Sequence, residues 1–218
     1  MKLVNKEGGI SWMQFVADEV KPLRGFRVPE LLKVISERYE FSKSPTHEEA
    51  STKGALFYTG RFAEKNINIA ALNIQSNLIG VTTYDTDDSE IVLMDLFEYL
   101  KEKFEFRDPL AKPQRAYQSD LVVDFENDPD QLIEQFSPLA KMLGKELESL
   151  NGDKKPIQFN RIDLASDPSI PKSGMIFLIE RRAGVPYATN RFFCKAYLRT
   201  DRHLVALAML EDLLGKTR

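Results

Sequence analysis

The sequence predicts an α+β protein in which helices flank an antiparallel or mixed β-sheet. Two observations support this class. The β-rich runs occur in groups between amphipathic helical stretches, without the regular strand–helix alternation of a doubly wound parallel sheet. Apolar residues make up 43% of the 218 residues and charged residues 29%, as in soluble globular proteins, so the chain can bury a substantial core.

The first predicted helix lies in the segment "VPELLKVISERYEF". Pro29 suits its first turn, because the N–H that proline lacks would have no helical partner there. Before this helix, the polar stretch "NKEGG" indicates a turn. After it, Thr46 followed by Glu49 has the spacing of a capping box for one short helical turn. The apolar residues of the first helix recur at helical spacing: Leu31, Leu32, Ile35 and Tyr39.

Three predicted strands follow, at 55–60, 66–75 and 78–84, and the last two are close enough to form a hairpin. An amphipathic helix comes next, with Asp87 as the expected N-cap and Glu90 three residues later. The apolar face of this helix is wide enough to cover a sheet. It contains Ile91, Met94, Leu96, Phe97 and Leu100.

The second half of the chain offers a similar set of elements. "YQSDLVVDF" predicts a strand, and a helical stretch runs from Asp128 to about Leu150, where Ser137 and Pro138 can start a second helix. Further strands are predicted at 157–164, 175–182 and 186–199, before a closing helix that follows Asp201.

Two segments resemble each other. "TTYDTDDSEIVLMDLFEYL" aligns with "AYLRTDRHLVALAMLEDLL" when Thr86 is matched to Thr200, and Leu93 then meets Leu207. Each segment is preceded by three β-rich runs. The sequence therefore predicts two related βββα units joined by a βα insert, with a chance match of two amphipathic helices as the alternative. The same alignment matches Val81 to Lys195.

Charge divides the chain unevenly. Residues 154–218 contain 12 Lys and Arg against 6 Asp and Glu, whereas residues 1–153 contain 18 against 27. With "NGDKKP" at 151–156 as a linker, we expect an acidic α+β unit at 1–150 and a basic βββα unit at 151–218, or one continuous domain in which the two halves neutralise each other. The net charge of −3 favours neither nucleic acid nor a membrane as a partner.

The expected location is the cytoplasm. Cys194 is the single cysteine, so no disulfide can form within the chain. The N-terminal segment lacks the apolar stretch of a secretory signal, and no run approaches the roughly 18 apolar residues of a membrane span.

Motifs for catalysis or metal binding are hard to find. His47 and His203 are the only histidines and have no ligand-like spacing, so we expect neither a metal nor another cofactor. The cluster Asp85, Asp87 and Asp88 fails the calcium-loop template, because the positions for Gly and the final Glu hold Glu90 and Leu96. Helix capping explains these aspartates, and a carboxylate-based active site near Asp85–Asp88 is the alternative. The sequence therefore predicts no catalytic residue.

The stretch "YATNRFFCKAYLR" alternates in character. On an extended strand, Phe192, Cys194 and Ala196 share one apolar face, which predicts an inert buried thiol. The opposite face would present cations between aromatic rings, as on surfaces that stack bases and neutralise phosphates. An ordinary solvent-facing strand surface is the alternative. The candidate ligand-binding residues are Arg191, Phe193, Lys195, Tyr197 and Arg199.

Taken together, these features predict a non-catalytic binding or assembly module that engages another protein or associates with itself. The first alternative is a nucleic-acid or nucleotide binder that uses the strand face at 187–199. The second is an enzyme with a carboxylate-based site near Asp85–Asp88.

Overall fold

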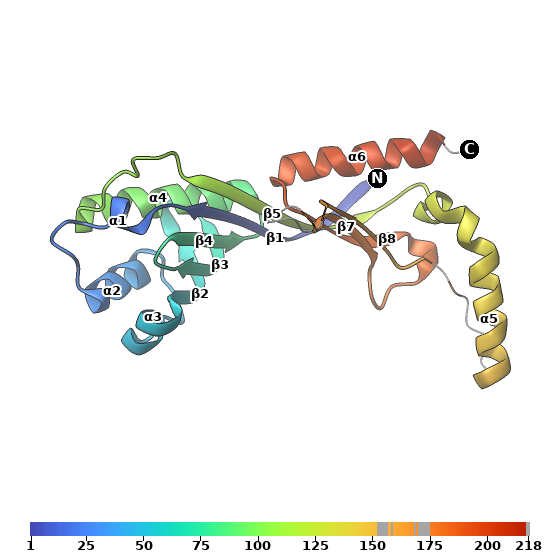
Figure 1. The fold of residues 1–218 in the computed structure, drawn as a ribbon, viewed down its shortest axis with the longest axis horizontal. Helices are drawn as coiled ribbons and strands as arrows, with labels where there is room; N and C mark the ends of the chain where they lie inside the picture. The colour runs from blue at the N-terminus through green and yellow to red at the C-terminus, as the bar shows by residue number, and fades with distance from the viewer. Residues whose placement is uncertain (152–156, 158, 168, 170–174, 217–218) are drawn as a thin grey trace. The chain divides into compact units, whose positions relative to one another are not determined.

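A computed structural model describes residues 1–151, 157, 159–167, 169 and 175–216, and it confirms the α+β class (Figure 1). Its eight strands form one sheet in the order β2-β3-β4-β1-β5-β8-β7-β6. The pairings β1–β4, β2–β3, β3–β4, β6–β7 and β7–β8 are all antiparallel. No helix in the described part of the chain is long and apolar enough to cross a membrane.

The N-terminal repeat consists of a strand, three short or medium helices, three strands and a long helix. Its elements are β1 (Lys2–Gln14), α1 (Ala17–Val20), α2 (Val28–Arg38), α3 (His47–Lys53), β2 (Ala55–Phe62), β3 (Ile67–Ile74), β4 (Leu78–Thr83) and α4 (Thr86–Phe104), with the 3-10 turn η1 (Ala63–Lys65) between β2 and β3.

The C-terminal repeat has the same order, with one α-helix after its first strand. Its elements are β5 (Gln114–Asp124), η2 (Pro129–Phe136), α5 (Ser137–Asn151), β6 (Arg161–Ala165), β7 (Met175–Arg181), η3 (Tyr187–Thr189), β8 (Arg191–Ala196) and α6 (Thr200–Lys216). The predicted linker falls largely on residues 152–156, which lie outside the described residues.

The strand registers of the two repeats can be matched to each other. In the N-terminal repeat, Phe57 lies opposite Leu72, which in turn lies opposite Val81. In the C-terminal repeat, β6, β7 and β8 form a matching row. That row contains Ile162, Ile179 and Cys194. Two backbone hydrogen bonds of the same length also correspond, from Phe15 N–H to the Asn77 carbonyl and from Phe125 N–H to the Asn190 carbonyl, at 3.0 Å each.

This correspondence corrects part of the sequence alignment. The register pairs Val81 with Cys194, not with Lys195. Two residues connect β4 to α4, whereas three connect β8 to α6, so an alignment fixed on the helix starts is one residue out of step in the strands. Within the helices the alignment agrees with burial, since Leu93 and Leu207 are both inaccessible to solvent.

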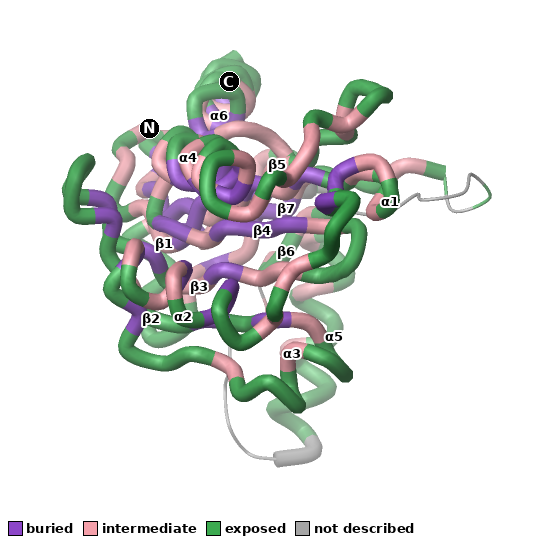
Figure 2. The backbone as a smooth tube through the Cα atoms, turned by 90° about the vertical axis from the view of Figure 1, so that its left-hand side faces the viewer, coloured by how far each residue is buried: buried purple, intermediate pink, exposed green. Residues whose placement is uncertain are grey.

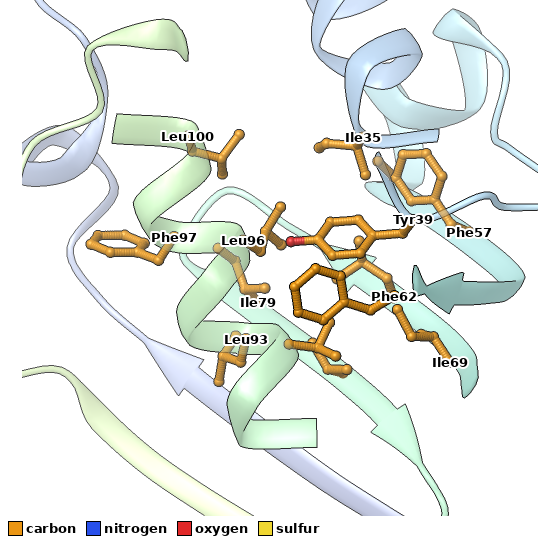
Figure 3. Close-up of a cluster of buried hydrophobic side chains, with 14 of the residues drawn as sticks. Ile35, Tyr39, Phe57, Phe62, Ile69, Ile79, Leu93, Leu96, Phe97 and Leu100 are labelled. Carbon is orange, nitrogen blue, oxygen red and sulfur yellow. The ribbon is translucent and has the colours of Figure 1, made fainter. Parts of the chain in front are cut away.

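The chain forms two compact units that cut across the repeats. The larger unit contains Lys6–Asp120 and Tyr197–Asp201, and the smaller contains Met1–Asn5, Leu121–Ala196 and the chain from Arg202 on. In the larger unit, α2 and α4 cover one face of the sheet. Figure 3 shows their side chains meeting those of the strands. Its labelled residues are Ile35, Tyr39, Phe57, Phe62, Ile69, Ile79, Leu93, Leu96, Phe97 and Leu100.

The smaller unit has a narrower core, formed by α6 and the strands β5, β7 and β8. Leu207 and Leu214 of α6 are buried with Leu121, Ile179 and Phe192 of the strands. In contrast to α2, α5 buries none of its described residues (Figure 2).

The prediction of a turn at "NKEGG" is wrong, because these residues belong to β1. Gly9 occupies this strand where the chain enters α4: a Cβ atom at this position would lie only 2.1 Å from the carbonyl carbon of Asp85. The glycine therefore permits a close backbone approach that a side chain would prevent.

Candidate binding surfaces

The strand face predicted at 187–199 is shorter than expected. Tyr187 lies in η3, and β8 extends only from Arg191 to Ala196. The predicted orientation is confirmed within that strand, where Phe192, Cys194 and Ala196 are buried. Arg191, Phe193 and Lys195 are half-buried on the other face and belong to the smaller unit, whereas Tyr197 and Arg199 follow the strand and belong to the larger unit.

Arg191 is held by an acid of its own repeat. Its Nε and one terminal nitrogen donate to the two carboxylate oxygens of Asp124, over 2.7 and 2.9 Å. These hydrogen bonds from the guanidinium lower the pKa of Asp124 below its usual value. A phosphate group bound here would have to compete with that carboxylate.

Arg199 is also paired. It donates to Glu90 over 2.6 Å and to Asp87 over 2.5 Å, and its guanidinium lies 5.3 Å from the ring centre of Tyr117. Two of the three predicted cations on this face are thus neutralised by carboxylates of the same chain, which favours a structural role for them.

The acidic cluster at the start of α4 caps the helix. The N-cap is Asp85, not Asp87 as predicted, and its side chain accepts from the N–H of Asp87 over 2.9 Å and forms an ion pair with Lys6. Partial burial alone would raise the pKa of Asp85, but the hydrogen bonds from Lys6 and Asp87 outweigh it and lower that pKa. Burial and the nearby charge of Asp85 raise the pKa of Asp88.

Other chemistry-bearing side chains lie in the core. Cys194 is inaccessible, and burial raises the pKa of its thiol well above the usual value, so the reactive thiolate is disfavoured. His203 is buried in α6 with its ring edge-on to Phe177, at 5.8 Å between ring centres. Among the described residues, no group of three or more His, Cys, Asp or Glu side chains could hold a metal ion.

The first surface that the sequence did not reveal is a cavity of about 480 Å³ in the larger unit. It opens between α1, α2 and α3 and reaches the end of β3. Phe26 and Phe106 pack against each other at its wall, with ring centres 5.3 Å apart and ring planes tilted by 45°. The other apolar lining residues come from the same helices and strands. They include Phe15, Val20, Val28, Leu31, Leu32, Ile74, Ile79 and Leu100.

One wall of this cavity is fixed by Arg107. Its side chain donates to the carbonyls of Lys21 and Asp18, over 2.9 and 2.5 Å, and its backbone N–H donates to the Val20 carbonyl over 2.8 Å. These bonds secure the short helix α1 to the segment after α4. The cavity is therefore bounded by positioned backbone on this side.

The second such surface is the apolar side of α5. Leu139, Leu143 and Leu147 recur at helical spacing, and these residues are 48%, 42% and 39% exposed. Phe136, at the end of η2, is 52% exposed beside them. The sequence shows the apolar residues at helical spacing, but it does not show that they are exposed, because the same pattern is typical of a helix packed on a core.

No protein-family model matches the sequence, and no match is found among curated proteins. Function is therefore inferred from the chemistry of these surfaces.

Proposed function

We propose that this protein is a binding and assembly module that associates with a second copy of itself through the apolar side of α5. The observation that supports this most directly is a difference between corresponding helices. In the N-terminal repeat, α2 buries Leu31, Leu32 and Ile35 against the sheet and α4. The corresponding stripe of α5 is exposed to solvent.

The choice of a second copy as partner depends on α6. In the N-terminal repeat, Arg38 and Tyr39 at the end of α2 contact Asp95 and Tyr99 of α4. When the two long helices are aligned at Thr86 and Thr200, Asp95 and Tyr99 correspond to Met209 and Leu213.

These α6 residues are apolar and largely exposed. Met209 is 62% exposed, Leu213 56%, and Val205, one turn earlier, 51%. In the C-terminal repeat, α5 and α6 thus each have an exposed apolar side. In the N-terminal repeat, the corresponding helices α2 and α4 contact each other at these positions. A symmetric dimer in which α5 of each copy packs on α6 of the other would cover both surfaces.

The test is the oligomeric state of the full chain. Sedimentation velocity at about 1–100 µM spans the range in which a self-association that depends on concentration becomes visible. We expect the wild-type protein to form dimers. Leu139→Glu with Leu143→Glu should give monomers with unchanged circular dichroism, and Val205→Glu with Met209→Glu on α6 should do the same.

A matched control lies on the opposite side of α5. Lys141→Glu changes the net charge by the same amount as the double leucine substitution but lies away from the stripe, so we expect it to remain dimeric. A monomeric wild type throughout the concentration range, or a dimer that survives either double substitution, would refute the proposal.

A further inference from the structure

We infer that the cavity between α1, α2 and α3 is a ligand site for an amphipathic molecule with an apolar chain and an anionic head, of the alkyl carboxylate class. This site is independent of the proposed dimer surface, since all of its residues belong to the larger unit. Its volume of about 480 Å³ lies within the range of roughly 300–1,000 Å³ that is typical of small-molecule sites.

The apolar chain is indicated by the interior. Phenylalanine rings and aliphatic side chains from every neighbouring element line the cavity, and Leu31, Leu32, Ile79 and Leu100 connect it directly with the main core. A flexible hydrocarbon chain gains from such a surface because each buried methylene is removed from water.

The anionic head is indicated by the charges of the lining. Lys21 follows α1 and Lys53 ends α3, and both are exposed. Neither Asp nor Glu occurs among the described residues that line the cavity, although acids outnumber bases in residues 1–153. An anionic group near these two ammonium groups would be favoured, whereas a cationic group would be repelled.

Polar groups also line the cavity near the lysines. Ser51 and Thr52 already donate their hydroxyl protons to backbone carbonyls of α3, over 2.8 and 2.9 Å, so these hydroxyls do not donate to a bound carboxylate. Gln75 and Ser76 add further polar side chains from the end of β3. The lining therefore combines an apolar interior with polar and cationic groups, which matches a molecule with one apolar part and one charged part.

Isothermal titration calorimetry of the full chain with dodecanoate tests the inference, with dodecanol and dodecyltrimethylammonium as neutral and cationic comparisons. We expect dodecanoate to bind most tightly and the cation most weakly. Shortening the carboxylate to decanoate and octanoate should weaken binding by about fourfold for each methylene removed. Methyl NMR shifts should move for Leu31, Ile79 and Leu100.

The lysines are tested by Lys21→Glu with Lys53→Glu, which should weaken dodecanoate binding by about tenfold or more and leave dodecanol within about twofold. Lys65→Glu with Lys112→Glu makes the same charge change at exposed lysines outside the lining, so it should leave both affinities within about twofold. Absence of binding, equal affinity for dodecanol and dodecanoate, or shifts confined to other residues would overturn the inference.

Discussion

The two repeats have the same arrangement of strands, but their helices cover the sheet to different extents. In the N-terminal repeat, α2 and α4 together cover one face of the sheet, and the buried cluster extends from Met13 in β1 to Leu100 in α4. In the C-terminal repeat, α6 packs on the strands, whereas the apolar side of α5 is exposed. The strand registers correspond in both.

The difference teaches that strand pairing and helix coverage are set separately. The alternation of apolar residues along each strand and the lengths of the turns fix the register, and they tolerate apolar side chains of different shape at corresponding positions, such as Phe57 and Ile162. Whether a helix covers the sheet depends on the side chains of the long helix that it packs against. Where α4 has Asp95, which binds Arg38 of α2 and Tyr39 just after it, α6 has the apolar Met209.

The largest expected change in the free energy of unfolding comes from shortening a side chain of α2, which is buried in the N-terminal repeat, whereas the corresponding side of α5 is exposed. Ile35 of α2 is inaccessible to solvent. We expect Ile35→Ala to lower the free energy of unfolding by about 2–5 kcal/mol, because it removes buried methyl groups and leaves a cavity. Urea unfolding followed by circular dichroism measures this change.

The control for Ile35 is Leu143 in α5, which is 42% exposed. Leu143→Ala should lower the free energy of unfolding by less than about 1 kcal/mol when measured at a concentration low enough to keep the chain monomeric. Equal losses from the two substitutions would show that the repeats do not differ in helix coverage.

A second comparison concerns the first strand of each repeat. Gly9 lies six residues before Phe15, and Ser119 lies six residues before Phe125. Because a Cβ atom on Gly9 would overlap the backbone at Asp85, we expect Gly9→Ala to lower the free energy of unfolding by about 1–3 kcal/mol. Ser119 is also fully buried, and Ser119→Ala adds no atom that could overlap the backbone, so it controls for the steric effect in the same urea assay. A Gly9→Ala protein as stable as the wild type would contradict the close approach.

The third prediction tests the contact between corresponding threonines. Thr86 and Thr200 exchange hydrogen bonds: the N–H of Thr200 donates to the Thr86 hydroxyl over 2.8 Å, and the N–H of Thr86 donates to the Thr200 hydroxyl over 3.2 Å. Thr86→Val and Thr200→Val should each cost about 1–3 kcal/mol, because each leaves a buried N–H without its acceptor.

The two substitutions should not be additive. The hydroxyls also bond to each other, over 3.1 Å, and either single change already removes that bond. We therefore expect the double variant to lose less than the sum of the single losses, by about 0.5–1 kcal/mol in a double-mutant cycle. Strict additivity would show that the hydroxyls do not interact.

Local patterns predicted much of the fold. The runs at 55–60, 66–75 and 78–84 became β2, β3 and β4, and the second half of the predicted helix from Asp128 starts at Ser137 as expected. The capping box at Thr46 is present, with the Glu49 N–H donating to the threonine hydroxyl over 3.2 Å. These features depend on neighbouring residues, which the sequence shows directly.

The features that the sequence did not predict depend on distant residues. Two adjacent glycines by themselves indicate a turn. The reason for a glycine at position 9 is instead the start of α4, which contacts the backbone there and lies far away in the sequence. Likewise, the alternation around Cys194 correctly predicted which side chains are buried, but not that Asp124 and Glu90 would neutralise Arg191 and Arg199. The cavity and the exposure of α5 are tertiary properties of the same kind.

The smallest expected effect concerns the pair of Asp124 and Arg191, where β5 and β8 meet in the C-terminal repeat. Hydrogen bonds from Arg191 lower the pKa of Asp124, so the pair stabilises the fold above the pKa of the unfolded chain, near 3.8. That contribution is lost as the pH falls through the lower folded pKa. Carboxyl NMR titration should show the Asp124 pKa rising in Arg191→Gln, whereas Arg161→Gln, which removes a different exposed pair in the same repeat, should leave it unchanged. An unchanged Asp124 pKa in Arg191→Gln would mean that Arg191 does not neutralise this carboxylate in solution, and the strand face would then keep its cation for an anionic partner.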